Sequence, residues 1–158
     1  MLREQEHVGL LIAAAQRSVK LAVLGRARAL GLTAQQFWFL NAARELPGAT
    51  LGEIARRRRM DPPTASRLAE GLARRGLVRT AHDDRDRRAL RILLTPAGTK
   101  AAERIAPVAA SVRNALVRGM SRREQDALRA SLRRVVANLT HFAEETVAER
   151  GPHAGGPA

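Results

Sequence analysis

One predicted helix, residues 62–75, concentrates groups suited to recognising a polyanion. Its inward positions are apolar, whereas its other side carries small, polar and cationic side chains that can approach base edges and phosphates closely. Arg67 is the best candidate base reader, because a planar guanidinium can bind O6 and N7 of guanine together. The helix N-terminus should itself favour a phosphate. An ordinary solvated amphipathic helix is the alternative. The exposed candidates are Pro63, Thr64, Ser66, Arg67 and Arg74.

A second cationic group follows in the predicted turn at residues 82–89. The run Asp83-Asp84-Arg85-Asp86-Arg87-Arg88 alternates acids with arginines. The acids could brace the arginine stems and hold the guanidiniums out at the tip, where a narrow minor groove attracts them. For any single arginine, a self-neutralising surface turn is the alternative.

Short helices and a hairpin must position these groups. Capping boxes at Thr33–Gln36 and Thr50–Glu53 predict helices through Leu46 and to about Arg58. Asp61 followed by two prolines predicts the start of the helix that ends before Gly76. Runs 77–81 and 90–94 have strand lengths. A helix followed by a charged hairpin is the order in which a winged helix grips duplex DNA.

Long amphipathic helices flank this unit on both sides. Apolar residues at three-to-four spacing predict a helix over 4–29, a second begins at Thr95-Pro96, and a capping box at Ser121–Glu124 starts a third. Such helices are too long to be buried by so small a unit, so we expect two copies to pack them together as a homodimer. The expected interface residues are Val8, Leu11, Ile12, Leu132, Val135, Leu139 and Phe142.

The predicted fold is therefore mainly α with a small β-hairpin wing: a winged helix-turn-helix between N- and C-terminal dimerisation helices. Within one intertwined domain per protomer, the predicted boundaries are residues 1–30 for the first dimerisation helix, 31–98 for the DNA-binding unit and 99–148 for the C-terminal helices. Residues 149–158 are rich in glycine and proline and are expected to be a disordered tail.

Composition limits the classes of function. The net charge of +13 favours a polyanionic partner, although 26 of the 28 basic residues are arginine, a bias that a GC-rich genome would also produce. Residues 50–95 hold 12 arginines against six acids, so they are the most basic part. The absence of cysteine excludes disulfides and thiol redox sensing. No apolar run of membrane-spanning length and no signal-peptide pattern is evident, which predicts a cytoplasmic, nucleoid-associated protein without a membrane partner.

The sequence resembles the MarR family of bacterial transcription regulators over roughly residues 8–140. The resemblance rests on LGLT at 30–33, on the run from Leu51 to Thr80, and on DDRDRRALRILLTPAG at 83–98. It implies that the recognition-helix contacts fall on Pro63, Thr64, Ser66 and Arg67. It likewise places the wing contacts on Arg85, Arg87 and Arg88, with Asp86 as a brace for one of them. The basic run 56–59 departs from the family's usual composition and could add phosphate contacts or simply reflect the arginine bias.

An effector site is also expected. The resemblance implies a cleft for small aromatic acids between the dimer helices and the winged unit. Trp38 could line it or instead pack against the first helix, whereas Phe37 and Phe39 are expected in the core. Asn41 could offer an amide to the ligand, and His7 lies near the expected cleft. The four histidines show no ligand spacing, so neither a metal nor a cofactor is expected beyond a possible small aromatic or anionic effector.

The sequence thus predicts a ligand-responsive transcriptional regulator, most often a repressor in this family. It would bind double-stranded DNA at a pseudo-palindromic operator as a homodimer. A sequence-independent architectural DNA-binding protein is the alternative that the high charge favours. No triad, carboxylate pair or glycine-rich phosphate loop supports an enzyme.

Overall fold

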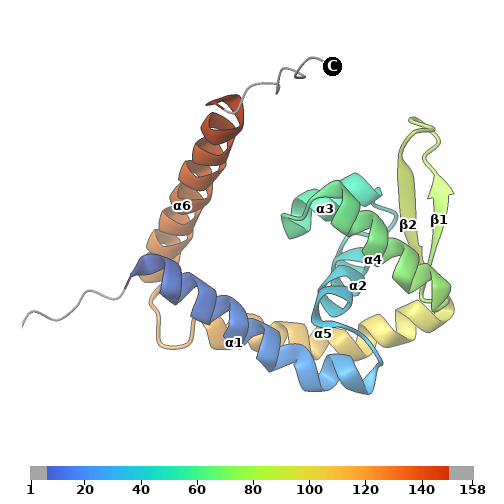
Figure 1. Cartoon of the computed structure of the whole chain (residues 1–158). Coiled ribbons are helices and arrows are strands. Elements are labelled where there is room, and N and C mark those ends of the chain that lie inside the picture. The colour runs from blue at the N-terminus through green and yellow to red at the C-terminus, as the bar shows by residue number, and fades with distance from the viewer. Residues whose placement is uncertain (1–6, 150–158) are drawn as a thin grey trace, which may run out of the picture. The chain divides into compact units, whose positions relative to one another are not determined.

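The computed structural model describes residues 7–149. The chain forms two compact units, Met1–Leu116 and Val117–Ala158, and each is described by itself. Figure 1 shows the elements. Unit 1 holds α1 (Val8–Ala29), α2 (Ala34–Glu45), α3 (Leu51–Arg58), α4 (Pro62–Arg74), β1 (Val78–His82), β2 (Leu90–Leu94) and α5 (Pro96–Leu116); unit 2 holds α6 (Arg122–Glu149).

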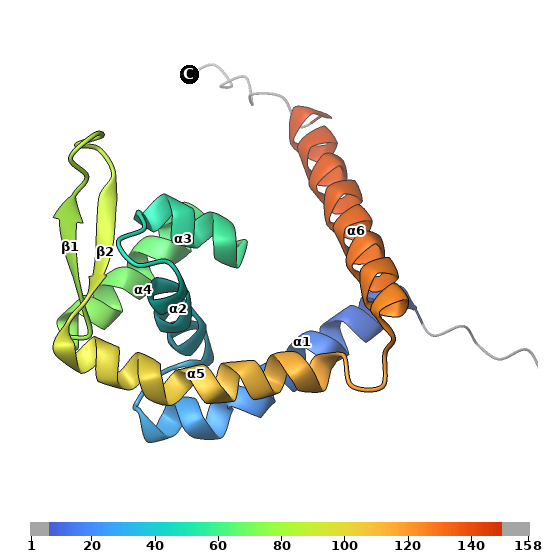
Figure 2. The ribbon, with the colours of Figure 1, turned by 180° about the vertical axis from the view of Figure 1, so that it is seen from behind.

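This grouping differs from the predicted boundaries at 30 and 98. Helices α1 and α5 belong to the same unit as the winged helix, because their buried faces pack on α2. Seen from behind in Figure 2, α5 runs along the base of the winged unit beside α1. The proposed tail lies outside the described residues, except Glu149, which is the last residue of α6.

The predicted helix starts are confirmed by their caps. Thr33 and Thr50 each accept a hydrogen bond from the backbone of the residue three positions later, and Gln36 and Glu53 return one. Asp61 caps α4, with proline in its first turn. Helix α1 begins at Val8, where the His7 side chain accepts from the Gly9 backbone N–H as its N-cap. The predicted helical residues 4–6 lie outside the described residues.

The hairpin is antiparallel, with Val78 opposite Leu94 and His82 opposite Leu90. The first strand begins one residue later than predicted. The N–H of Leu77 still donates to the carbonyl of Leu72, 3.0 Å away, and Gly76 has the positive φ of 66° that this helix ending needs. Leu77 therefore completes the end of α4 before the strand starts.

The core is built around α2. The predicted core residues Phe37 and Phe39 are fully buried, together with Leu40. Val23 of α1 and Ile105 of α5 are equally buried and belong to the same cluster. Helix α2 is thereby covered from several sides, which fixes the elements around it.

Helix α1 requires a correction to the expectation that no segment suits a membrane. By length and composition it is apolar enough to cross one. Arg17 and Lys20, however, lie in its middle, where charges are costly in lipid. Its last turns pack in the core through Val23 and Ala27. We therefore interpret α1 as a packing helix.

Unit 2 is a single long helix that begins at the predicted capping box. Ser121 donates its backbone N–H to Glu124, 2.7 Å away, and its hydroxyl accepts from the Glu124 backbone N–H. Large apolar side chains remain exposed along α6 in the single chain, up to 61% for Leu139 and 65% for Phe142.

The junction of hairpin and α5 predicts a sharp sensitivity at Gly98. A Cβ added there would overlap the carbonyl oxygen of Leu77 and lie 2.8 Å from its carbonyl carbon. Because both contacts are with backbone, Gly98→Ala should lower the free energy of unfolding by at least about 1–3 kcal/mol. Gly52→Ala is the control, since the nearest atom is 4.0 Å away, and it should change stability by no more than about 1 kcal/mol. Equal urea midpoints for the two variants would contradict this packing.

Candidate nucleic-acid interface and the adjoining cleft

The N-cap residue Asp61 hydrogen-bonds to the first turn of α4. The Asp61 carboxylate accepts from the Thr64 backbone N–H at 2.8 Å and from the Thr64 hydroxyl at 2.9 Å. These hydrogen bonds hold the pKa of Asp61 below its ordinary value. Arg67 is exposed and donates to the same hydroxyl at 3.2 Å. The hydroxyl of Thr64 is therefore the resting partner of the candidate base reader.

The expected phosphate at the N-terminus of α4 would find no free backbone N–H in the first turn. Pro62 and Pro63 have no N–H, and the N–H of Thr64 is taken by Asp61. The next amide, that of Ala65, donates to the carbonyl of Asp61. Phosphate binding at this end of α4 must therefore come from side chains.

The other helix candidates lie on the outer side of α4. Pro63 is exposed and Ser66 is half-buried. Arg74 is exposed and lies 4.0 Å from Glu70, a surface ion pair too weak to hold it in place. The side that carries Arg67 is thus free of covering structure within unit 1.

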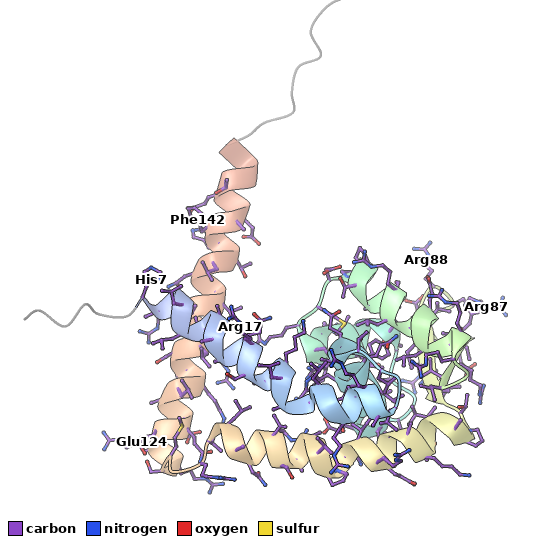
Figure 3. The ribbon with its side chains drawn as sticks, turned by 60° about the horizontal axis from the view of Figure 1, so that its bottom comes forward. His7, Arg17, Arg87, Arg88, Glu124 and Phe142 are labelled. Carbon is purple, nitrogen blue, oxygen red and sulfur yellow. The ribbon has the colours of Figure 1, made fainter. Side chains whose placement is uncertain are left out.

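The wing presents its three arginines in solvent. Arg85, Arg87 and Arg88 are exposed, and Figure 3 shows Arg87 and Arg88 at the hairpin tip, pointing away from the rest of unit 1. Asp86 does not brace a guanidinium in the described residues: its carboxylate accepts from the backbone N–H of Arg88 at 3.0 Å. The acid shapes the turn and leaves the arginine side chains free.

A cleft lies beside the start of α4, within unit 1. Its volume is about 1010 Å³, and it is formed by α1, the start of α2, and the end of α3 with the turn to α4. Trp38 lines it and is half-buried, with its ring edge-to-face on Phe37 at 5.3 Å. Residues of α1 line the same cleft, so Trp38 lies beside the first helix, and its role towards an effector stays a prediction. The lining residues are Ala13, Gln16, Arg17, Val19, Lys20, Thr33, Ala34, Gln35, Trp38, Arg58, Arg59, Met60 and Thr64.

The charged residues that line this cleft are all cationic. Arg17, Lys20, Arg58 and Arg59 line it, and none of its lining residues in the described part of the chain is acidic. Arg58 lies over the Trp38 ring, 5.1 Å from its centroid, in cation–π geometry. Burial lowers the pKa of Arg58, with Arg57 and Arg113 adding to the effect and Glu45 opposing it.

Arg58 is a cation without a full set of partners. Its buried Nε has no hydrogen-bond partner within residues 7–149. Arginine stays protonated even when its pKa falls, so the cost of burial is met only if an anion or another acceptor reaches it. This cleft is therefore chemically suited to a small anion with an aromatic ring, which Trp38 could stack against.

Two predicted pocket residues are placed elsewhere. Asn41 is 2% exposed, donates to Glu45 at 3.0 Å and does not line the cleft. Sequence spacing could not show this, because residues three apart, such as Trp38 and Asn41, lie on neighbouring positions of one helix side. His7 caps α1 and is likewise absent from the lining. Of the predicted effector residues only Trp38 lines the cleft of one chain.

Sequence reasoning missed the cations of the cleft. Arg58 and Arg59 lay in the basic run 56–59, which did not indicate which members turn inward. Arg56 and Arg57 are exposed, whereas Arg58 is half-buried and Arg59 ends α3 in the left-handed region at φ 50°. The three-to-four periodicity of α3 alone could have separated Arg58, which lies one turn after Ile54 and Ala55, from its neighbours.

Comparison with known proteins finds similarity to one family of regulators. A model of the MarR family matches residues 30–89, which contain α2, α3, α4, β1 and the wing turn. The chain is 28% identical to Bordetella bronchiseptica BpsR over 83% of this chain and 99% of that chain, with a TM-score of 0.67. BpsR was solved in a study of how 6-hydroxynicotinic acid regulates its DNA binding. The segment that holds the helix-turn-helix and the wing turn is thus similar to the MarR family.

Other solved structures agree with this MarR-family fold. A probable transcriptional regulator from Pseudomonas aeruginosa is 27% identical over 84% of this chain and 99% of that chain, with a TM-score of 0.65. MepR of S. aureus, solved in complex with DNA, is 22% identical over 86% and 99%, with a TM-score of 0.75, and supports the fold alone. No curated protein matches the chain. The predicted DNA contacts thus lie in the winged helix-turn-helix that matches the MarR family model.

Proposed function

We propose that this protein is a ligand-responsive transcriptional repressor of the MarR family that binds a pseudo-palindromic operator as a homodimer. One observation carries the proposal: α4 exposes Arg67 beside a hairpin whose tip exposes Arg87 and Arg88. Helix α4 would enter the major groove, and the wing would reach the minor groove or the backbone. The protein would act in the cytoplasm at the nucleoid, without enzymatic activity.

Homodimer formation is proposed from unburied apolar surface. Val8 and Leu11 on α1 are exposed, as are Leu132, Leu139 and Phe142 on α6. Ile12 and Val135 lie among them and are half-buried. Exposed apolar surface of this extent is typical of a protein–protein interface, and a two-fold dimer would cover it. The dimer would place half-sites about one helical turn apart.

The effector is proposed to be a small aromatic acid. Its carboxylate would pair with Arg58 or Arg17, and its ring would stack on Trp38. BpsR supports this class, because 6-hydroxynicotinic acid, an aromatic acid, regulates DNA binding by that protein. The cleft lies between α1 and the turn that precedes α4, so an occupant would change the spacing of the two recognition helices.

The alternative is an architectural protein that binds DNA without sequence preference. The net charge of +13 supports it, because phosphate contacts alone give tight binding at low salt. Such a protein would gain little from a particular operator over random DNA and would show steep salt dependence.

The first test concerns Arg67. With an operator selected from random DNA by the wild-type protein, Arg67→Ala should cost about 1–3 kcal/mol of binding for each half-site and relax the preference at one base position. Arg104→Ala, an exposed arginine on α5, is the matched control and should keep the preference. An unchanged preference in Arg67→Ala would show that α4 does not read that base, and failure to select any sequence would favour the architectural alternative.

The second test concerns assembly. Leu139→Arg would bury an unpaired charge in the proposed interface, so the dimer should dissociate or unfold in sedimentation velocity experiments. Leu139→Met conserves volume and should remain dimeric. A folded, dimeric Leu139→Arg protein would place the interface elsewhere.

The third test uses Trp38, which is the only tryptophan of the chain, as a fluorescence reporter. Its emission should change on titration with 6-hydroxynicotinate but not with the uncharged 6-hydroxynicotinamide. Arg58→Gln should weaken the acid about 10- to 100-fold, because a charged hydrogen bond is lost. Arg56→Gln, on the exposed side of the same helix, should bind as the wild type does. Equal responses to acid and amide would rule out Arg58 as the anchor of a carboxylate.

A further inference from the structure

Arg91 of β2 joins the wing to the turn between α2 and α3. Its guanidinium pairs with the Asp83 carboxylate at 2.5 Å and donates to the carbonyl of Gly48 at 2.8 Å. Asp83 opens the wing turn, whereas Gly48 belongs to the turn that leads into the helix-turn-helix. One side chain therefore bridges two segments that lie more than thirty residues apart in the sequence.

Asp83 is the other half of this bridge. One of its carboxylate oxygens accepts from the backbone N–H groups of Arg85 at 2.8 Å and Asp86 at 2.9 Å, while the other pairs with Arg91. Its side chain is only 9% exposed, although it lies in the charged turn. The backbone N–H groups, followed by Arg91, hold the pKa of Asp83 below its ordinary value, so the carboxylate stays charged at neutral pH.

Other hydrogen bonds of the wing turn stay within the hairpin: the Asp83 N–H donates to the Ala89 carbonyl at 2.9 Å, and His82 Nδ1 lies 2.9 Å from the Arg87 carbonyl. They shape the turn but do not attach it to the helix-turn-helix. An isolated two-stranded hairpin is marginally stable in water. Beside the bridge, β2 is tied to the helix-turn-helix by the Ile92 N–H, which donates to the carbonyl of Ala49 at 2.9 Å, and by pairing of Thr50 with Arg91. Both ties lie in the middle of β2. Toward the tip, Arg91 connects Asp83 of the wing turn with Gly48 of the turn between α2 and α3.

We propose that Arg91 is a positioning residue for DNA binding: through Asp83 and Gly48 it holds the wing turn at a fixed distance from α4, so that Arg87 and Arg88 meet the DNA while Arg67 reads the major groove. This proposal rests on the proposed DNA-binding function. Arg91 itself is half-buried and need not touch DNA. Because Arg91 orders the wing before binding, the wing would lose less conformational entropy when it binds DNA.

The proposal is tested first without DNA. Hydrogen exchange of the full-length protein reports the amides of Arg85 and Asp86, which Asp83 holds. In Arg91→Gln these amides should exchange faster than in the wild type, while the amides of α4 and α5 keep their protection. Arg104→Gln, which removes an exposed arginine from α5, should change neither group. Unchanged exchange at the wing turn in Arg91→Gln would overturn the proposed bridge, whether or not the protein binds DNA.

The second test uses the operator selected by the wild-type protein. Arg91→Gln should lose hydroxyl-radical protection at the flanking positions that Arg87→Gln/Arg88→Gln also loses, yet keep the major-groove footprint of α4. Its log–log salt slope should flatten by about 0.9 unit for each lost phosphate contact, as in the double variant. Adding Arg91→Gln to the double variant should change affinity by less than about twofold, because the two changes act on one contact.

Two results would overturn the role of Arg91. In the first, Arg91→Gln keeps the flanking protection. In the second, Arg91→Gln loses the α4 footprint together with the flanking protection, which would make Arg91 a general support of the fold. A wild-type protein that selects no DNA would instead contradict the proposed function, and the hydrogen-exchange comparison would still decide whether the bridge orders the wing.

Discussion

Burial of α2 is the constraint on which the rest of unit 1 depends. Phe37, Phe39 and Leu40 are fully enclosed, so α1, α4 and α5 must each present an apolar face to this one helix. Closely packed interiors tolerate little displacement, because each shift opens a void or a clash. The positions of α3, of the turn to α4 and of the hairpin base follow from that packing, and with them the separation between Arg67 and the wing.

The same packing divides the basic run at the end of α3 into two kinds of arginine. Arg57 faces outward and lies 3.8 Å from Glu45, which also accepts from Arg113 of α5 at 2.8 Å. Arg58 turns toward Trp38 and the cationic cleft. Four consecutive residues of one type thus serve two different surfaces, and the composition of the segment alone says nothing about which residue does which.

Short sequence patterns predicted the helices and the hairpin well. The site depends instead on contacts between residues that lie far apart in the sequence. Capping boxes at Thr33 and Thr50 are hydrogen-bond patterns within four residues, so the sequence contains everything that decides them. The cleft is different, because Arg17 and Arg58 come to line one cleft only after α1 and α3 have packed on α2. The same holds for Asp83, whose partners in the wing are backbone amides and whose cationic partner is Arg91, not the neighbouring arginines that the alternating pattern suggested.

The hydroxyl of Thr64 has a consequence for how information could pass through this protein. Thr64 lines the cleft, and its hydroxyl donates to Asp61 and accepts from Arg67. One residue therefore belongs both to the wall of the cleft and to the resting contact of the candidate base reader. Communication between such sites is usually sought in chains of contacts that cross tens of ångströms. Here the shortest route is a single hydrogen bond, so a molecule that competes for this hydroxyl would act on Arg67 without any relay.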